Sequence, residues 1–249
     1  MSASESPLRS QQSARPALKI IVAIDGPSGA GKSTVARHLA RHFGLLNLET
    51  GAMYRAFALK ALRAGVPLDE SAALERLAAH TAIRLEPGEE GNCVLLDGED
   101  VTGLLRNQTI TDAASRVSVH SPIRSWMVQM QQKLGAEGGI VMEGRDIGTV
   151  VFPHAEVKIF LDAALEVRGL RRFDQMAGNS QIAQSGPQPA QQPEAVIRDL
   201  RARDERDRNR ADSPLKPAGD ATVLDSTDLS LEEVLRAAEA IIAAKRLSE

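Results

Sequence analysis

A glycine-rich stretch near the N-terminus has the residue types and spacing of a phosphate-binding loop. Residues 20–34 read IIVAIDGPSGAGKST and contain the pattern G-x-x-x-x-G-K-S. Glycines let the backbone turn with its N–H groups pointing inward, where they can bind phosphate oxygens. The lysine would reach the β- and γ-phosphates, and the serine hydroxyl would hold Mg²⁺. We predict a nucleoside triphosphate site with these residues: Gly26, Pro27, Ser28, Gly29, Ala30, Gly31, Lys32, Ser33 and Thr34.

A second candidate site is an arginine-rich segment at 194–210. Arg203, Arg206 and Arg210 recur at i, i+3 and i+7, so they would share one face of a helix with Asp207. A charge-alternating helix can also be a solvated surface helix with ion pairs between residues four apart. Three adjacent guanidinium groups repel one another unless an anion binds, however, and a Gln- and Pro-rich flexible connection precedes them. We therefore favour a lid that closes over phosphate groups.

Two shorter stretches carry further candidate ligands for an anion or a base. Arg145 and Asp146 follow a predicted buried strand, at the sheet edge where ligands of open α/β folds bind. The arginine could bind a phosphate and the aspartate could accept from a base amino group, or the two could form a simple turn pair. Thr50, Tyr54 and Arg55 follow the second predicted strand. Core packing is the commoner explanation of a residue such as Tyr54, whereas the adjacent arginine favours an anion site.

Strands that alternate with helices must position these residues. Short apolar runs predict strands at 20–24, 45–48, 140–142, 157–161 and 222–224. Helical patterns are predicted at 33–43, 52–64, 69–79, 106–116, 122–134 and 194–210, and from residue 230 onward. Gly44 ends the first of these helices, and Ser230 with Glu233 forms a capping-box pattern at the start of the last. The flexible connection spans 178–193. This alternation predicts an α/β fold with a parallel sheet and helices on both faces. Short alternating runs between 83 and 101 predict an antiparallel excursion in an inserted subdomain.

Composition excludes several classes of protein. The chain has 249 residues and a net charge of −3, which gives no sign of a nucleic-acid partner. No apolar run approaches the ~18 residues of a membrane span. A single cysteine, Cys93, excludes an internal disulfide framework and suits a reducing cytoplasm. The five histidines show no spacing that indicates a metal cage. We expect a cytoplasmic protein that binds no membrane and no nucleic acid, with a disordered tail at 1–17.

From residue 20 to residue 247 the chain resembles the bacterial-type cytidylate kinases of the P-loop nucleoside monophosphate kinase family. The resemblance rests on IDGPSGAGKST, TGAMYR, LDGEDV, EGRDIGTVVFP, VKIFLD and RDERDRNRA. It implies a P-loop NTPase fold with a five-stranded parallel sheet, an inserted NMP-binding subdomain and a mobile helical lid. It also implies a pyrimidine nucleotide reaction in which ATP and CMP (or dCMP) give ADP and CDP (or dCDP), with Mg²⁺ held by Ser33.

The resemblance assigns roles to residues that match the family motifs. It places Arg55, Arg145 and Arg210 on the acceptor phosphate, and Ser115 and Asp146 on the cytosine. The implied CMP-binding residues are Thr50, Tyr54, Arg55, Ser115, Arg124, Arg145, Asp146, Arg203, Asp207 and Arg210. The implied catalytic residues are Lys32, Arg145, Arg206 and Arg208.

In the same way, Arg203 and Asp207 would contact the sugar, and Arg206 and Arg208 would lie over the transferring phosphates. One position departs from the family pattern Pro-x-Val-Arg, because this chain reads Pro-Ile-Arg-Ser at 122–125. The base-reading arginine is thus displaced by one residue. Either Arg124 reaches the base or this contact is lost.

The resemblance also divides the chain. The core would comprise 18–64, 117–176 and 211–249, the NMP-binding insertion 65–116, and the lid 177–210. We expect a monomer whose partners are ATP and CMP or dCMP. Two alternatives stay open: a kinase for another monophosphate or a small alcohol, and a nucleotide-dependent switch without an acceptor. The sequence argues against the switch, because it lacks the N-K-x-D motif with which GTPases bind the base and because a switch would not need an arginine-bearing lid.

Overall fold

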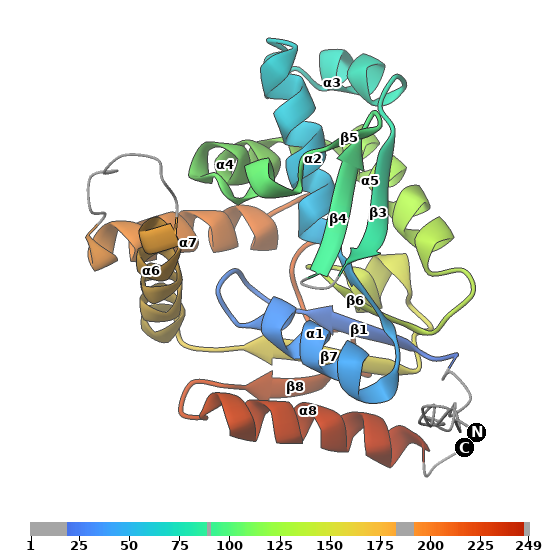
Figure 1. Ribbon diagram of the computed structural model, residues 1–249, viewed down its shortest axis with the longest axis vertical. Helices are drawn as coiled ribbons and strands as arrows, with labels where there is room; N and C mark the ends of the chain where they lie inside the picture. Colours follow the sequence, from blue (N-terminus) through green and yellow to red (C-terminus); the bar gives the residue numbers. More distant parts are fainter. Residues whose placement is uncertain (1–18, 89–90, 183–191, 247–249) are drawn as a thin grey trace, which may run out of the picture.

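The computed structural model describes residues 19–88, 91–182 and 192–246 (Figure 1). The tail predicted at 1–17 lies outside the described residues. So does the part of the predicted flexible connection that falls within 183–191.

A five-stranded parallel sheet lies at the centre of the molecule, in the order β2-β6-β1-β7-β8. All five predicted strands are confirmed, and the resemblance correctly implied this sheet. Residues of the inner strands are buried on both faces, as their continuous apolar runs predict. The strands are β1 (Ile21–Asp25), β2 (Leu46–Glu49), β6 (Ile140–Glu143), β7 (Val157–Asp162) and β8 (Thr222–Asp225).

Helices cover both faces of this sheet (Figure 1). On one face, α1 (Lys32–Phe43) and α8 (Leu231–Arg246) bury an apolar cluster against β1 and β7. On the other, α2 (Thr50–Arg63) and α5 (Ser121–Leu134) belong to a second cluster. The start of α8 has the predicted capping box, since the Ser230 amide and hydroxyl both donate to Glu233 Oε2.

The antiparallel excursion is confirmed as a three-stranded sheet, β3-β4-β5, flanked by helices. It shares its apolar cluster with α2 and α5, so the insertion is packed onto the core along its length. Its elements are α3 (Ser71–Ala78), β3 (Ile83–Gly88), β4 (Gly91–Leu96), β5 (Glu99–Asp100), η1 (Thr102–Arg106) and α4 (Gln108–Val117).

Two packed helices, α6 (Leu165–Ile182) and α7 (Pro193–Arg208), project from the carboxyl edge of the sheet (Figure 1). We call them the lid helices; α6 begins before the range 177–210 that the resemblance implied for the lid. The expectation of an irregular connection from residue 178 was wrong for 178–182, which continue α6. Extending an existing helix adds one hydrogen bond per residue without a new nucleation step, so a segment with no apolar periodicity can still be helical. Within the described residues, no helix combines the length and the apolar character that crossing a membrane requires.

Candidate active site

The loop between β1 and α1 has the backbone conformation of a phosphate-binding loop. Gly26 has φ +145°, and a Cβ atom there would lie 2.0 Å from the Leu161 carbonyl oxygen. Gly31 has φ +97° and is the N-cap of α1. No other residue type fits the first position, and the second is strained for any side chain. The loop therefore directs the N-terminus of α1, with its free N–H groups, toward the carboxyl edge of the sheet.

Lys32 is buried in this loop and donates to the Pro27 carbonyl oxygen at 2.7 Å. Burial, followed by the nearby cations Arg145 and Arg203, lowers its pKa to about 7 against the opposing effect of Glu143. A buried ammonium among guanidinium groups is electrostatically costly unless an anion neutralises it. The loop is thus prepared for a highly charged ligand.

Asp25, at the end of β1, fixes the neighbouring loop. Its Oδ1 and Oδ2 accept from the backbone N–H groups of Ile147 (2.8 Å) and Gly148 (2.7 Å) at the start of the turn η2 (Ile147–Val151). Burial raises the pKa of this carboxyl to about 6. Sequence reasoning missed this role; the only signal was an acid that directly follows a buried strand.

An oxygen-rich group lies where β6 ends. Glu143 is buried, and its Oε1 has no hydrogen-bond partner in the described part of the chain. Burial and the nearby Glu49 carboxylate raise the pKa of Glu143. The predicted residue Thr50 is buried beside it and donates its hydroxyl to the Glu143 carbonyl at 2.7 Å. These groups could hold a hard cation.

The predicted phosphate and sugar ligands that follow β6 and lie at the end of α7 and just beyond it meet directly. Arg145 Nε donates to Asp207 Oδ2 at 2.9 Å, and Arg210 Nη1 lies 3.8 Å from Asp207 Oδ1. Burial alone would raise the pKa of Asp207, but Arg145, Arg203 and Arg210 hold it below its usual range. Arg210 Nη2 is buried with no partner among the described residues. The cations outnumber the single carboxylate, so this group favours an added anion.

The predicted base-reading residues form an adjoining group. Arg124 is buried, donates to Asp146 Oδ2, and lies 5.9 Å from the centre of the Tyr54 ring. Burial raises the Tyr54 pKa to about 12. The Ser115 hydroxyl is buried and has no partner within the described ranges. Despite its displacement in the sequence, Arg124 thus lies next to Asp146.

The remaining predicted arginines differ in their hydrogen-bond partners and in their exposure to solvent. Arg55 pairs with Glu49, and Arg203 has a buried Nε that lacks a partner in the described structure. Burial lowers the Arg203 pKa to about 10, with Arg145 as the next cause. Arg206 is half-buried, whereas Arg208 is exposed and lies on another side of α7.

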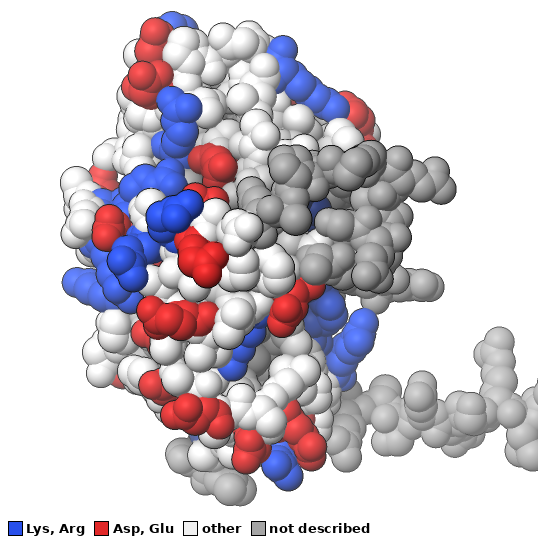
Figure 2. Space-filling model, turned by 90° about the vertical axis from the view of Figure 1, so that its left-hand side faces the viewer, with Lys and Arg blue, Asp and Glu red and all other residues white. Residues whose placement is uncertain are grey.

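The structure thus brings most of the predicted ligands into one group, which we call the polar site. Its members are Tyr54, Arg124, Arg145, Asp146, Arg203, Asp207 and Arg210. Figure 2 views the molecule from the side of α6 and α7 and shows Lys and Arg side chains gathered at mid-height, with Asp and Glu among them. The outer surface of the lid is therefore of mixed charge, in contrast to the cation-rich interior.

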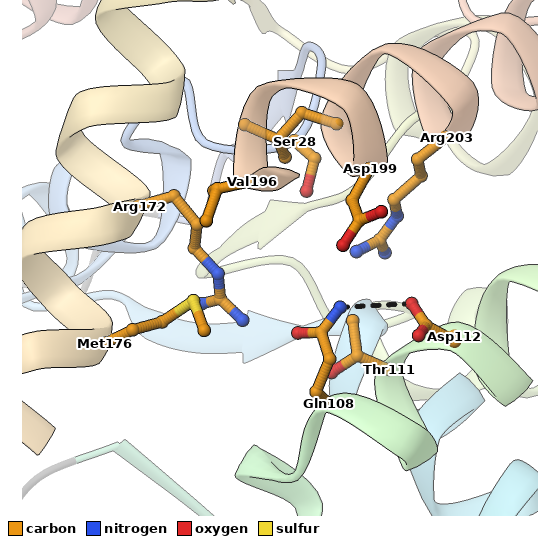
Figure 3. Close-up of a pocket in the computed structure, with 10 residues that line it drawn as sticks. Ser28, Gln108, Thr111, Asp112, Arg172, Met176, Val196, Asp199 and Arg203 are labelled. Carbon is orange, nitrogen blue, oxygen red and sulfur yellow. Dashed lines mark hydrogen bonds between the residues drawn. The ribbon is translucent and has the colours of Figure 1, made fainter. Parts of the chain in front are cut away.

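A small pocket lies where the phosphate loop, α4 and the two lid helices meet (Figure 3). Ser28 comes from the loop, Arg172 from α6, and Arg203 from α7. Across the pocket on α4, Gln108 donates to Asp112 Oδ1 at 3.1 Å. Insertion and lid therefore face each other directly above the loop.

One lid residue that sequence reasoning missed is Arg168. Its Nη1 donates to the Ser28 carbonyl at 3.0 Å and pairs with Asp204 Oδ2 at 2.7 Å, and its Nε donates to the Ala163 carbonyl at 2.8 Å. Both charged side chains are buried. A single guanidinium thus joins the phosphate loop to both lid helices. Its position on the helix after β7 was the only sequence signal, because its partners are far away along the chain.

Comparison with known proteins identifies related sequences along almost the whole chain. A family model described as cytidylate kinase matches residues 22–244. The cytidylate kinase of Pasteurella multocida (strain Pm70) is 46% identical over 217 residues, which are 87% of this chain and 92% of that relative. The cytidylate kinase of Pelotomaculum thermopropionicum is 45% identical over 226 residues, 90% of this chain and 96% of the relative. That of Geobacter sp. (strain M21) is 46% identical over 220 residues, 88% and 91% respectively.

Proposed function

The chain belongs to the cytidylate kinase family and is a nucleoside monophosphate kinase, and from this premise we propose that the polar site binds CMP or dCMP for phosphorylation by ATP. The products are ADP and CDP or dCDP. The observation that best supports the proposal is the placement of buried, unpartnered polar atoms in two adjoining groups beside the phosphate loop. A nucleoside monophosphate carries a phosphate at one end and a hydrogen-bonding base at the other, which matches this arrangement.

The phosphate loop would bind the triphosphate of ATP. Lys32 would exchange its hydrogen bond to the Pro27 carbonyl for the β- and γ-phosphates, and residues 28–34 would supply backbone N–H donors. The charge of the nucleotide would restore the normal protonation of Lys32, since an adjacent anion favours the ammonium form.

The acceptor would lie across the site with its phosphate on the arginines. Arg145 and Arg210 would rotate their free N–H groups onto it, with Arg55 approaching from α2. The cytosine would lie near Ser115 and Asp146, where an acceptor carboxylate and an unpaired hydroxyl suit its amino group and ring edge. Tyr54 and Thr50 would line this side, and Arg203 and Asp207 would contact the sugar.

Arg124 would hold Asp146 in position for the base. Its guanidinium retains one unpartnered atom, Nε, after binding Asp146 and the Ser118 carbonyl. This arrangement supports the first of the two sequence-based alternatives, in which Arg124 contributes to base recognition.

Mg²⁺ fits the oxygen-rich group at the end of β6. The buried Glu143 Oε1 lacks a partner in the described structure, and the nearby Ser33 side chain opposes the rise in the Glu143 pKa. Oxygen donors of this type are preferred by Mg²⁺. We propose that Ser33, with Glu143 beside it, would hold the ion, which when bound supplies charge neutralisation at the phosphates.

Positioning and charge stabilisation would supply most of the rate, because phosphoryl transfer needs little covalent chemistry from the protein. The lid would exclude water, so that ATP is not hydrolysed. Arg206 and Arg208 are proposed to contact the transferring phosphates; the exposed position of Arg208 implies that this needs a rotation of α7. Arg168 contacts Ser28 of the phosphate loop and pairs with Asp204 of α7, so it would couple the binding of ATP in the loop to the position of α7.

A coupled assay of ADP release tests this function. With ATP and Mg²⁺, we expect CMP and dCMP to be phosphorylated with higher kcat/KM than UMP or AMP, and CDP to accumulate. Preference for UMP or AMP would overturn the base assignment. ATP hydrolysis without phosphorylation of any monophosphate would favour the switch, and phosphorylation of a small alcohol would favour that alternative.

We also propose that the protein acts in the cytoplasm as a monomer, without nucleic acid or a membrane as partner. The slightly acidic net charge of −3 supports the exclusion of polyanions. Light scattering during gel filtration should give the mass of one chain, 26.7 kDa; a mass of twice that value would contradict the proposal.

A further inference from the structure

Two histidines and a glutamate converge on the far side of the sheet from the lid. His38 and His42 lie four residues apart on α1, and Glu239 approaches them from α8. His38 Nε2 lies 2.5 Å and His42 Nδ1 3.2 Å from the same oxygen, Glu239 Oε1. All three potential ligand atoms lie within 4.8 Å of one another.

The arrangement has the ligand types of a transition-metal site. Imidazole and carboxylate together suit Zn²⁺ and its neighbours in the first transition row, and residues at i and i+4 lie on one face of a helix. Bonds of 2.0–2.2 Å in a tetrahedral site place ligand atoms about 3.4 Å apart. The three atoms here need only small rotamer adjustments to reach that spacing.

The surroundings favour a preformed and accessible site. Beneath it, Leu39 and Ala238 are fully buried, so packing fixes the two helices relative to each other. The side chains of His42 and His38 are 50% and 35% exposed, which leaves an approach from solvent.

We propose that His38, His42 and Glu239 bind one divalent transition-metal ion of the Zn²⁺ class, which cross-links α1 to α8. With three protein ligands, a fourth position is left for water. This site is separate from the Mg²⁺ proposed for catalysis, because it lies at the C-terminal half of α1 whereas Ser33 lies at its N-terminus. The spacing of the histidines alone did not indicate this site, because the third proposed ligand, Glu239, follows His38 by 201 residues.

The bound ion would stabilise the folded protein. It binds the folded chain, in which α1 and α8 are in contact, and finds no assembled site in the unfolded chain. At a Zn²⁺ concentration about 100-fold above the dissociation constant, we expect the Tm to rise by about 5 °C or more.

Calorimetric titration of the untagged full-length protein with Zn²⁺ tests the proposal. Wild type should bind one equivalent, and His42→Ala, His38→Ala and Glu239→Gln should each weaken binding by about 10-fold or more and remove the Tm increase. His42 is half-exposed, so its variant should fold normally. The matched controls are His154→Ala, an exposed histidine elsewhere, and Cys93→Ser, which removes the only thiol.

Absence of measurable Zn²⁺ binding would show that the cluster is only a hydrogen-bonded surface group, and the proposal would be overturned. Binding that persists in His42→Ala and Glu239→Gln but disappears in either control variant would also overturn it, because the metal would then lie elsewhere. As an independent readout, the imidazole NMR signals of His38 and His42 should shift on adding one equivalent of Zn²⁺, while that of His154 stays in place.

Discussion

The α1–α8 face of the sheet and the polar site differ in what is buried. On the α1–α8 face, Leu39, Ala238 and Ile242 are fully buried and apolar, and the His38–Glu239 pair lies at the solvent-exposed rim. At the polar site, buried positions hold guanidinium and carboxyl groups. Several of their polar atoms lack partners among the described residues: Ser115 Oγ, Arg124 Nε, Arg203 Nε and Arg210 Nη2.

The residues that stabilise the fold and the residues that are proposed to bind the substrate therefore lie in different regions of the molecule. Apolar burial on the α1–α8 face stabilises the fold and holds the phosphate loop at the start of α1. The polar site is instead arranged for a ligand that is absent from the free protein, and unpaired buried groups there cost free energy until it binds. Mutations in the two regions should therefore have opposite consequences for activity and stability, which the following predictions test from the largest expected effect to the smallest.

Removal of the loop lysine should have the largest effect on catalysis. Lys32→Ala should lower kcat/KM for CMP phosphorylation by about 10³-fold, because it removes a cation from the phosphates in the transition state. Its circular dichroism spectrum should match wild type. Lys133→Ala, an exposed lysine, is the control. Transfer within a few-fold of wild type in Lys32→Ala would remove Lys32 from the mechanism.

A mutation on the α1–α8 face should instead lower the stability of the protein and leave its activity nearly unchanged. Ile242 is fully buried between α8 and the sheet, and Ile242→Ala should reduce the free energy of unfolding by about 2–5 kcal/mol through the lost apolar contact and the cavity. Chemical denaturation measures this loss. Below the unfolding transition, kcat/KM should remain within about twofold of wild type. A large loss of kcat/KM in the folded variant would contradict the separation of the two regions.

Loss of one arginine from the polar site should mainly affect the acceptor. Arg210→Ala should weaken CMP binding by about 10²-fold with little change in ATP affinity, because its unpartnered Nη2 is proposed to bind the acceptor phosphate. Isothermal titration with each nucleotide separately measures both. Arg236→Ala, on the exposed side of α8, serves as the matched control. Weaker ATP binding with normal CMP binding would mean that the two substrate sites are exchanged.

The smallest effect concerns the stability cost of Lys32 in the free protein. Its pKa falls from 10.5 in the unfolded chain to about 7 in the folded one, so between these values the unfolded state binds more protons. The cost is complete below pH 7 and disappears as the pH rises toward 10.5. Lys32→Met should accordingly be more stable than wild type at pH 7, and the difference should shrink by pH 9.

Urea denaturation of both proteins at pH 7, 8 and 9 without nucleotide measures this trend. Asp25, whose pKa is raised to about 6, titrates below this range in wild type. Because Lys32 lowers the Asp25 pKa, Lys32→Met should move that titration upward, so the change in stability between pH 8 and pH 9 is the one that reports on Lys32. A difference in stability that does not change with pH would show that Lys32 keeps its ordinary pKa in the folded protein.

Local sequence patterns predicted most of the fold correctly. The apolar runs of the five strands, the capping box at Ser230 and the glycine that ends α1 are short-range signals, and each was confirmed. The helix α6 was not predicted, and its continuation through 178–182 was misread, because packing against α7 and helix propagation outweigh weak periodicity. The roles of Asp25 and Arg168 were missed, because the contacts of Asp25 with Ile147 and Gly148 and of Arg168 with Ser28 each join residues more than a hundred positions apart.

The sequence by itself determined the phosphate loop, the parallel α/β architecture and the family, since these depend on residue types at fixed short spacings. Only the tertiary structure decided that Arg124 reaches Asp146, that Arg168 joins the loop to the lid, and that Glu239 completes a cluster with His38 and His42. The physical reason is that hydrogen bonds and ion pairs need side chains within about 3–4 Å. Such contacts are set by how helices pack on the sheet, which no local spacing records.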